Sequence, residues 1–185
     1  MPPSRTISLA PFEGCAATKP FSCSVSLQLQ GGLLQLCYSI SGPLRRLIIP
    51  AEAPLPCFAT DLWRSTCCEC FLRQETMKNY TEWNFAPSGN WWTCIFDDYR
   101  APARKQPSGL QPQHLKIQRR KNILTLTAAI VCPSQPALQI GPALILAHAD
   151  GCLSHWAMQH PGGKPDFHLP GTCACSLETR PHNPI

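Results

Sequence analysis

The chain has 185 residues, of which 44% are hydrophobic and 15% are charged, and its formal net charge is +5. This length suits one domain with one sizeable core, and the low charged fraction argues against general disorder. Twenty prolines are spread along the chain, which excludes a protein of long helices because proline disrupts helix interiors. We therefore expect a single domain over residues 1–185.

The positive charge does not by itself indicate a nucleic-acid partner. Its densest basic cluster, Gln118–Asn122, fits the polar tip of a hairpin, and no known nucleic-acid motif is present. No stretch approaches the roughly 18 apolar residues of a membrane helix. Residues 1–14 lack the apolar segment of a secretory signal. The sequence predicts a cytoplasmic protein with neither a nucleic-acid nor a membrane partner.

Alternation of apolar and polar residues with a period of two predicts β-strands in the first part of the chain. Ser22–Leu29 and Leu34–Ile40 alternate in this way, and Gly31-Gly32 between them is typical of a hairpin turn. The apolar run Leu44–Ile49 predicts a third short strand.

Three apolar and aromatic runs follow in the middle of the chain, namely Cys67–Arg73, Tyr80–Phe85 and Trp91–Asp97. Turn residues at Pro87–Asn90 separate the last two runs. Arg100–Pro112 holds three prolines and a glycine and is expected to be a loop.

The second half of the chain repeats this pattern of short strands and turns. Its predicted strands are His114–Arg120, Ile123–Ile130, Leu138–Ala149, Cys152–Met158 and Thr172–Leu177. A bend is expected at Gly141-Pro142 and a tight turn at Asp150-Gly151. About ten short strands result, which indicates an all-β fold, an antiparallel β-sandwich of jelly-roll or immunoglobulin-like type.

The twelve cysteines are expected to be reduced thiols, most of them packed inside apolar strands as small hydrophobic residues. The densest group is Cys67, Cys68 and Cys70, and no CxxC pair occurs anywhere. Zinc sites usually contain such closely spaced pairs. We expect no metal.

One strand of the central region combines polar residues on a single face. In Tyr80–Phe85, Glu82 and Asn84 share a face, and Trp83 points to the other. If the strand Cys67–Arg73 lies alongside, Glu69 converges with Glu82 and Asn84. Carboxylates and amides suit sugar hydroxyls, and Trp91 or Trp92 would add a flat apolar wall. Ordinary solvent-facing residues explain the pattern equally well.

Other chemistries have weaker signals. The pair Glu69 and Glu82 also fits a glycosidase, although such pairs occur often by chance. The four C-terminal histidines and Met77 or Met158 are compatible with haem, and Asp97-Asp98 with calcium. No GxSxG or nucleotide-binding motif is present.

The segments Asp61–Leu72, Tyr80–Trp91, Phe96–Arg100 and Ser154–His168 resemble the DOMON-like proteins, which are related to the family-9 carbohydrate-binding modules. The resemblance covers about residues 33–168 and implies a β-sandwich with a ligand cavity on one sheet. The wider superfamily holds sugar or haem.

The resemblance also suggests site residues and shows departures. Its polar positions match Glu69, Glu82, Asn84 and Arg100, and its aromatic positions match Trp63, Trp91 and Trp156. Cys68, Cys70 and Cys94 stand where larger side chains are usual, and His155 where tyrosine is common.

Together these observations predict a non-catalytic module that binds a saccharide or another small ligand on one concave sheet face, without a cofactor. The candidate ligand-binding residues are Trp63, Glu69, Glu82, Asn84, Trp91, Trp92, Arg100 and Trp156. The alternatives are a haem-binding DOMON-type domain, a glycosidase that uses Glu69 and Glu82, and an interaction domain whose protein partner is unknown.

Overall fold

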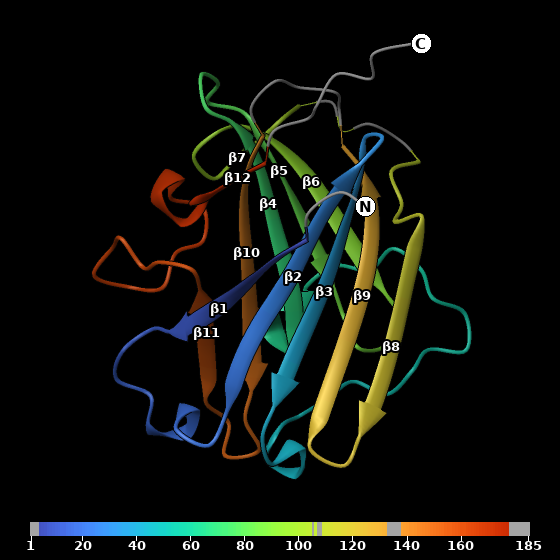
Figure 1. The fold of residues 1–185 in the computed structure, drawn as a ribbon, viewed down its shortest axis with the longest axis vertical. Helices are drawn as coiled ribbons and strands as arrows, with labels where there is room; N and C mark the ends of the chain where they lie inside the picture. Colours follow the sequence, from blue (N-terminus) through green and yellow to red (C-terminus); the bar gives the residue numbers. More distant parts are fainter. Residues whose placement is uncertain (1–3, 105, 107–108, 133–137, 178–185) are drawn as a thin grey trace.

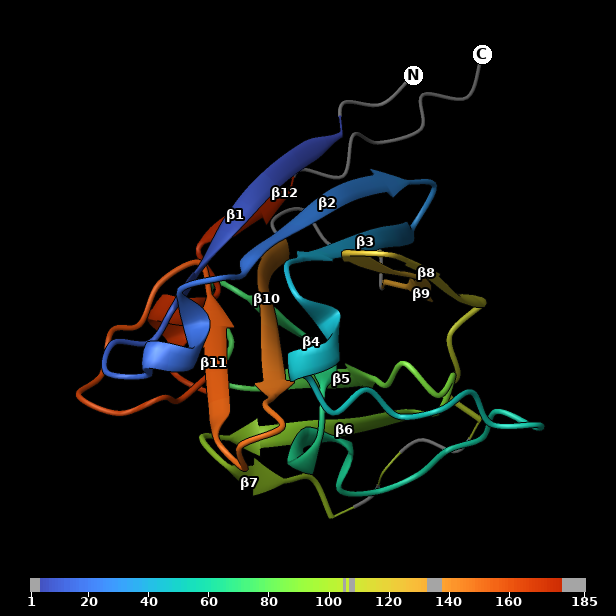
Figure 2. The same ribbon diagram turned by 90° about the horizontal axis from the view of Figure 1, so that it is seen from below.

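A computed structural model describes residues 4–104, 106, 109–132 and 138–177, and within them twelve β-strands form two facing layers (Figures 1 and 2). Within this part of the chain the named strands pair only in antiparallel fashion. The first layer has the order β1-β2-β3-β9-β8. Its strands are β1 (Arg5–Pro11), β2 (Ser22–Gln30), β3 (Leu33–Ser41), β9 (Ile123–Val131) and β8 (His114–Arg120).

The second layer has the order β7-β6-β5-β4-β10-β11, and β12 also pairs with β10. Its strands are β7 (Ala101–Pro102), β6 (Trp91–Asp98), β5 (Tyr80–Phe85), β4 (Cys67–Gln74), β10 (Leu138–Ala147), β11 (Leu153–Ala157) and β12 (Cys175–Leu177). Strand β1 joins the layers, since Ala10 and Pro11 pair with β11 while its earlier residues pair with β2. The fold is the predicted all-β antiparallel sandwich.

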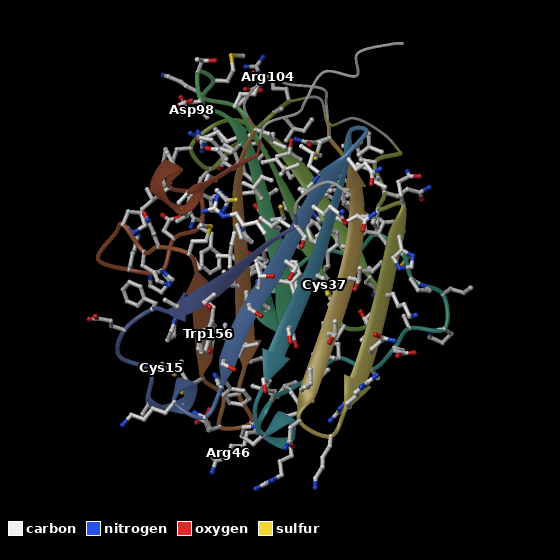
Figure 3. All side chains as sticks on the ribbon, in the orientation of Figure 1. Cys15, Cys37, Arg46, Asp98, Arg104 and Trp156 are labelled. Atoms are coloured by element: carbon white, nitrogen blue, oxygen red, sulfur yellow. The ribbon has the colours of Figure 1, made fainter. Side chains whose placement is uncertain are left out.

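Four short 3-10 helices connect the strands: η1 (Ala16–Thr18), η2 (Leu44–Arg46), η3 (Leu62–Arg64) and η4 (Pro170–Thr172). Arg46 in η2 and Asp98 at the end of β6 lie at opposite ends of the molecule (Figure 3). Among the described residues, no helix has the length and apolarity needed to cross a membrane.

The main core lies between the layers and follows the predicted alternation. The predicted stripe of β9 is fully buried, and so is the stripe of β3, the neighbouring strand of the same layer; these residues are Leu124, Leu126, Ala128, Ile130, Leu34, Leu36, Tyr38 and Ile40. Cys68, Trp83 and Phe85 meet them from the second layer. The hydroxyl of Tyr38 donates a 2.6 Å hydrogen bond to the backbone oxygen of Glu69. This bond connects the core to the middle of β4.

Three local predictions are wrong. Arg100–Pro112 is not loop throughout, because Ala101–Pro102 form β7. Leu44–Ile49 is not a strand, because Leu44–Arg46 form the 3-10 turn η2 and only Leu47 makes an isolated bridge, to His148. Gly141-Pro142 is not a bend but lies inside β10.

Pro142 is tolerated inside β10 because neither of the strands on one edge of β10 pairs with it. On one edge, β12 pairs with β10 as far as Ile140 and β11 begins at Ala143. Pro142 lies in the gap between these two partners, where a missing N–H is least costly. Gly141 is needed there as well, since a Cβ would lie 2.8 Å from Cys173 Sγ.

Candidate functional site

The outer face of the second layer, turned away from the core, carries most of the predicted polar residues. Side chains alternate along β5, so Trp83 and Phe85 enter the core while Tyr80, Glu82 and Asn84 occupy the outer face, as predicted. This face is not exposed to solvent. Glu82 is 6% exposed and Asn84 is 1% exposed.

Strand register brings the predicted acids together. Glu69 of β4 pairs directly with Asn84 of β5, and Asn84 pairs in turn with Trp92 of β6. On the other side of Glu69 the neighbour is Ala143 of β10. Residues that pair across strands on one face are in side-chain contact range. Glu69, Asn84 and Trp92 therefore form one row, beside which Ala143 leaves space.

A cavity of about 510 Å³ lies above this row. Its floor comes from the sheet, and its cover comes from the segment before η3 and from the loop after β11. The lining residues are Thr60, Asp61, Trp63, Glu69, Phe71, Glu82, Trp92, Phe96, Arg100, Ile145, His155, Pro165, Asp166, Phe167 and His168. The volume is in the range of small-molecule sites.

Asp166 holds the cover in place. Its Oδ1 accepts hydrogen bonds from Arg100 Nη2 at 3.0 Å and from the His168 backbone N–H at 3.1 Å, and its Oδ2 accepts one from the Tyr99 hydroxyl at 2.5 Å. Burial opposes ionisation of Asp166, but the bonds from Tyr99 and Arg100 outweigh it and lower the pKa of this carboxyl. Asp166 is therefore an anion at neutral pH that joins two distant segments.

Backbone strain is concentrated at the same cavity. Among the described non-glycine residues, Asp61 and Arg100 have a positive φ, 59° and 51°. Both line the cavity. Such conformations cost energy for residues with a Cβ and are enriched at binding sites.

The two glutamates of the floor are hard to ionise. Burial raises the pKa of Glu82 to about 7, and the hydrogen bond from Asn84 Nδ2 (3.0 Å) and the charge of Arg100 counteract it only in part. The pKa of Glu69 lies well above its usual value because of burial and, secondly, the charge of Glu82. Glu69 Oε1 has no hydrogen-bond partner within the described residues.

His168 is neutral beside them. Burial, followed by the charge of Arg100, lowers the pKa of His168 to about 4. Its Nε2 lies 3.7 Å from Glu82 Oε2, and its Nδ1 lies 2.7 Å from the Tyr80 hydroxyl. At neutral pH the contact with Glu82 is therefore polar and not an ion pair.

The eight candidate residues separate into three groups. Trp63, Glu69, Glu82, Trp92 and Arg100 line the cavity, as listed above. Asn84 lies directly beneath, bonded to Glu82. Trp91 and Trp156 do not line it. The side chain of each points to the inner face of the second layer and packs against the main core.

Trp156 belongs to a buried polar chain between β10 and β11. It lies on β11 (Figure 3) and is 3% exposed. Its Nε1 donates to Ser154 Oγ at 2.9 Å, and Ser154 Oγ lies 2.8 Å from His148 Nε2. Burial lowers the pKa of His148, which fits a neutral ring that accepts the serine proton. Trp156 thus has a structural position in this protein.

Replacing Ser154 with alanine is expected to lower the free energy of unfolding by about 2–3 kcal/mol, because Trp156 and His148 each lose a buried partner. Urea unfolding measures this loss. Ser39→Ala, on the outward side of β3, serves as the control and is expected to change stability by less than about 0.5 kcal/mol. Equal effects of the two substitutions would contradict the buried chain.

Several lining residues were not predicted. Asp166, Phe167 and His168 had a visible signal, since they lie in the C-terminal segment of the family resemblance. The sequence indicated no role for Asp166 or Phe167, and His168 was considered only among the four histidines compatible with haem. His155 shares its strand with Trp156 and faces the cavity in its place. Phe71 and Phe96 form an apolar cluster with Tyr80 on this outer face, whereas the apolar wall predicted for the site was a tryptophan, Trp91 or Trp92.

The cysteines and histidines show no metal-ligand geometry within the described part of the chain. All twelve cysteines are free thiols, and eight of them are buried. Asp98, considered for calcium, forms an exposed 3.6 Å ion pair with Lys78. The absence of a metal stays a prediction.

The cavity residues fit haem poorly. Met77 is 47% exposed and Met158 packs against the main core, so neither lines the cavity. Both ring nitrogens of His168 are directed at protein atoms, one at Tyr80 and one at Glu82. Among the described lining residues, His155 is the other histidine, and its ring packs against Phe167.

Comparison with known proteins shows the fold. No family model matches the sequence, and no curated protein matches it. A crystal structure of a Bacteroides uniformis protein, provisionally assigned as carbohydrate-binding, superposes with a TM-score of 0.58 and 13% identity; the match covers 91% of this chain and 83% of that one. A family-9 carbohydrate-binding module from Caldicellulosiruptor kristjanssonii, in complex with cellotriose, gives a TM-score of 0.58 at 8% identity, covering 86% and 74%. The chain thus has a fold like that of the family-9 modules.

Proposed function

We propose that this protein is a non-catalytic saccharide-binding module whose site is the cavity on the outer face of the second layer. The observation that carries this proposal is the row formed by Glu69, Asn84 and Trp92, which places buried acceptors beside an indole ring. Sugars need both, because their hydroxyls require fixed polar partners and their C–H faces pack on flat apolar rings. The fold comparisons are consistent with this class of ligand.

Two tryptophans provide apolar walls. Trp92 lies at the floor, next to Asn84. Trp63, in η3, stands at the rim and is 45% exposed. The guanidinium of Arg64 lies 5.0 Å from the centroid of the Trp63 ring, so the opposite face of this ring is the one available to a ligand.

The electrostatics favour binding over glycoside hydrolysis. A glycosidase needs one carboxylic acid and one carboxylate that is held ionised as base or nucleophile. Glu82, with a pKa of about 7, would suit the acid. Glu69 has no donor on Oε1, and burial raises its pKa, which is the opposite of what an ionised partner requires.

The test is a tryptophan-fluorescence titration of the reduced protein with mono- and oligosaccharides. A saturable response is expected, and Trp92→Phe is expected to weaken binding about tenfold by loss of stacking area. Trp91→Phe is the matched control, since the adjacent ring packs against the core, and it should retain the wild-type affinity.

Three outcomes contradict this proposal. If no saccharide changes the fluorescence, the ligand is not a saccharide. A Soret band after addition of haemin would then favour haem as the ligand. Equal losses of affinity in Trp92→Phe and Trp91→Phe would show that the saccharide does not bind at this cavity. Turnover of chromogenic glycosides that disappears in Glu82→Gln would show an enzyme.

A further inference from the structure

The cavity lining contains more carboxyl groups than permanently positive groups. Four carboxyl groups line it, from Asp61, Glu69, Glu82 and Asp166, and Arg100 is the lining residue with a permanent positive charge. Asp61 pairs with Arg64 at 3.3 Å, and Asp166 pairs with Arg100 at 3.0 Å. Glu69 and Glu82 therefore have no Lys or Arg partner within the described part of the chain.

Two acceptor atoms at the floor also lack donors. Glu69 Oε1 and Asn84 Oδ1 are buried and have no hydrogen-bond partner within the described residues. They belong to directly paired positions of β4 and β5. The Asn84 amide is oriented by its bond to Glu82, which directs its Nδ2 to the carboxylate and leaves Oδ1 open. Buried acceptors without donors are costly, so donors from a ligand or from ordered water would stabilise this floor.

An ammonium group meets this requirement better than a hydroxyl. It has three donors and no acceptor, and its charge favours the ionised form of both carboxyls, whereas a hydroxyl brings a single donor and no charge. Hydrogen bonds between charged groups are also about twice as strong as neutral ones. The indole of Trp92, next to Asn84, adds a face that attracts cations.

We propose that the ligand of this cavity is an amine-bearing saccharide, with the ammonium group of a 2-amino-2-deoxy sugar bound between Glu69, Glu82 and Asn84. This inference rests on the proposed function, because it assigns a sugar class to the same site. It makes the unpaired acids the determinants of specificity.

The other ionisable groups around the floor do not supply the missing charge partner. His168 faces Glu82 and stays neutral, and His155 has its pKa lowered by burial. Arg73 lies on the same face of β4 as Glu69, but the side chain of Phe71 lies between them. Its guanidinium donates to the carbonyl oxygens of Lys78 and His168 and stacks on Tyr80.

Proton release gives an independent signature. A bound ammonium favours the ionised form of nearby carboxyls and lowers their pKa. Since burial raises the pKa of Glu82 to about 7 in the free protein, binding at pH 6, where a primary amine is protonated, should expel a proton. Calorimetry in buffers of different ionisation enthalpy measures this release. A neutral sugar is expected to release far less.

The decisive experiment titrates the wild type, Glu69→Gln and Asp98→Asn with glucosamine, N-acetylglucosamine and glucose at pH 6, together with their disaccharides. Glucosamine is expected to bind about tenfold more tightly than the other two sugars. Glu69→Gln should reduce glucosamine affinity about tenfold and glucose affinity less than about twofold. Asp98→Asn makes the same charge change at an exposed position and should keep the wild-type preference.

The outcomes separate this inference from the proposed function. Equal affinity for glucose and glucosamine, without proton release, overturns the inference that the ligand carries an amine. The proposal of saccharide binding then still stands. Absence of binding to every sugar overturns both. Tighter binding of spermidine than of any amino sugar overturns the saccharide class. Proton release is measured on the wild type, so it decides the matter even if Glu69→Gln fails to fold.

Discussion

Glu82→Gln is expected to unfold at a higher urea concentration than the wild type at pH 8 and at the same concentration at pH 4. Burial raises the pKa of Glu82 from 4.5 to about 7, so the folded state binds this proton more tightly than the unfolded state. The associated stability is complete below pH 4.5 and is lost as the pH rises to about 7. Glutamine is never charged and avoids the loss. A shift of this size corresponds to about 3 kcal/mol at pH 8.

Urea unfolding of both proteins at pH 4, 6 and 8 checks this expectation. The opposite pH effect of His168, whose pKa is lowered to about 4, is present in both proteins and largely cancels in the difference. The variant should also bind saccharide at least about tenfold more weakly, because it loses a charged acceptor. Greater stability with weaker binding is typical of a residue kept for function. A gain that does not change with pH would show that ionisation of Glu82 is not the cause.

The sequence predicts the local part of this site well. Alternation along Tyr80–Phe85 is enough to place Glu82 and Asn84 on one face, and Glu69 converges with them because β4 and β5 are consecutive and antiparallel. A short connection leaves few ways to pair two such strands. The polar face was expected to meet solvent or to line a concave site, and the structure shows the second.

The sequence could not predict how distant segments cover the floor. Asp166 meets Arg100 because β10 lies between β4 and β11, and this strand order has no local signal. The choice between Trp91 and Trp92 depends on the exact register with β5, where Trp92 pairs with Asn84. Trp156 was assigned to the site as an aromatic residue. Side chains alternate along β11, however, so that His155 points outward to the cavity and Trp156 points into the core.

Asp166→Ala is expected to release the cover of the cavity. The carboxylate is 3% exposed as a side chain and accepts hydrogen bonds from Tyr99, Arg100 and the His168 backbone. Removing it leaves these donors unpaired, which is expected to cost about 2–4 kcal/mol of folding stability. Arg100, which has a positive φ of 51°, also loses the contact that holds its side chain over the cavity. Saccharide affinity should therefore fall by at least about tenfold.

Hydrogen exchange distinguishes loss of the cover from general unfolding. In Asp166→Ala, amides of residues 166–168 should exchange faster, while amides of β3 and β9 in the core should keep their protection because they share no contact with Asp166. Asp166→Asn retains one carbonyl acceptor and should show a smaller effect on both exchange and affinity. Asp98→Ala removes an exposed ion pair with Lys78 and is expected to change stability by less than about 0.5 kcal/mol. If Asp166→Ala bound saccharide as tightly as Asp98→Ala, the loop 165–168 would have no part in holding the ligand, and the sheet floor alone would account for binding.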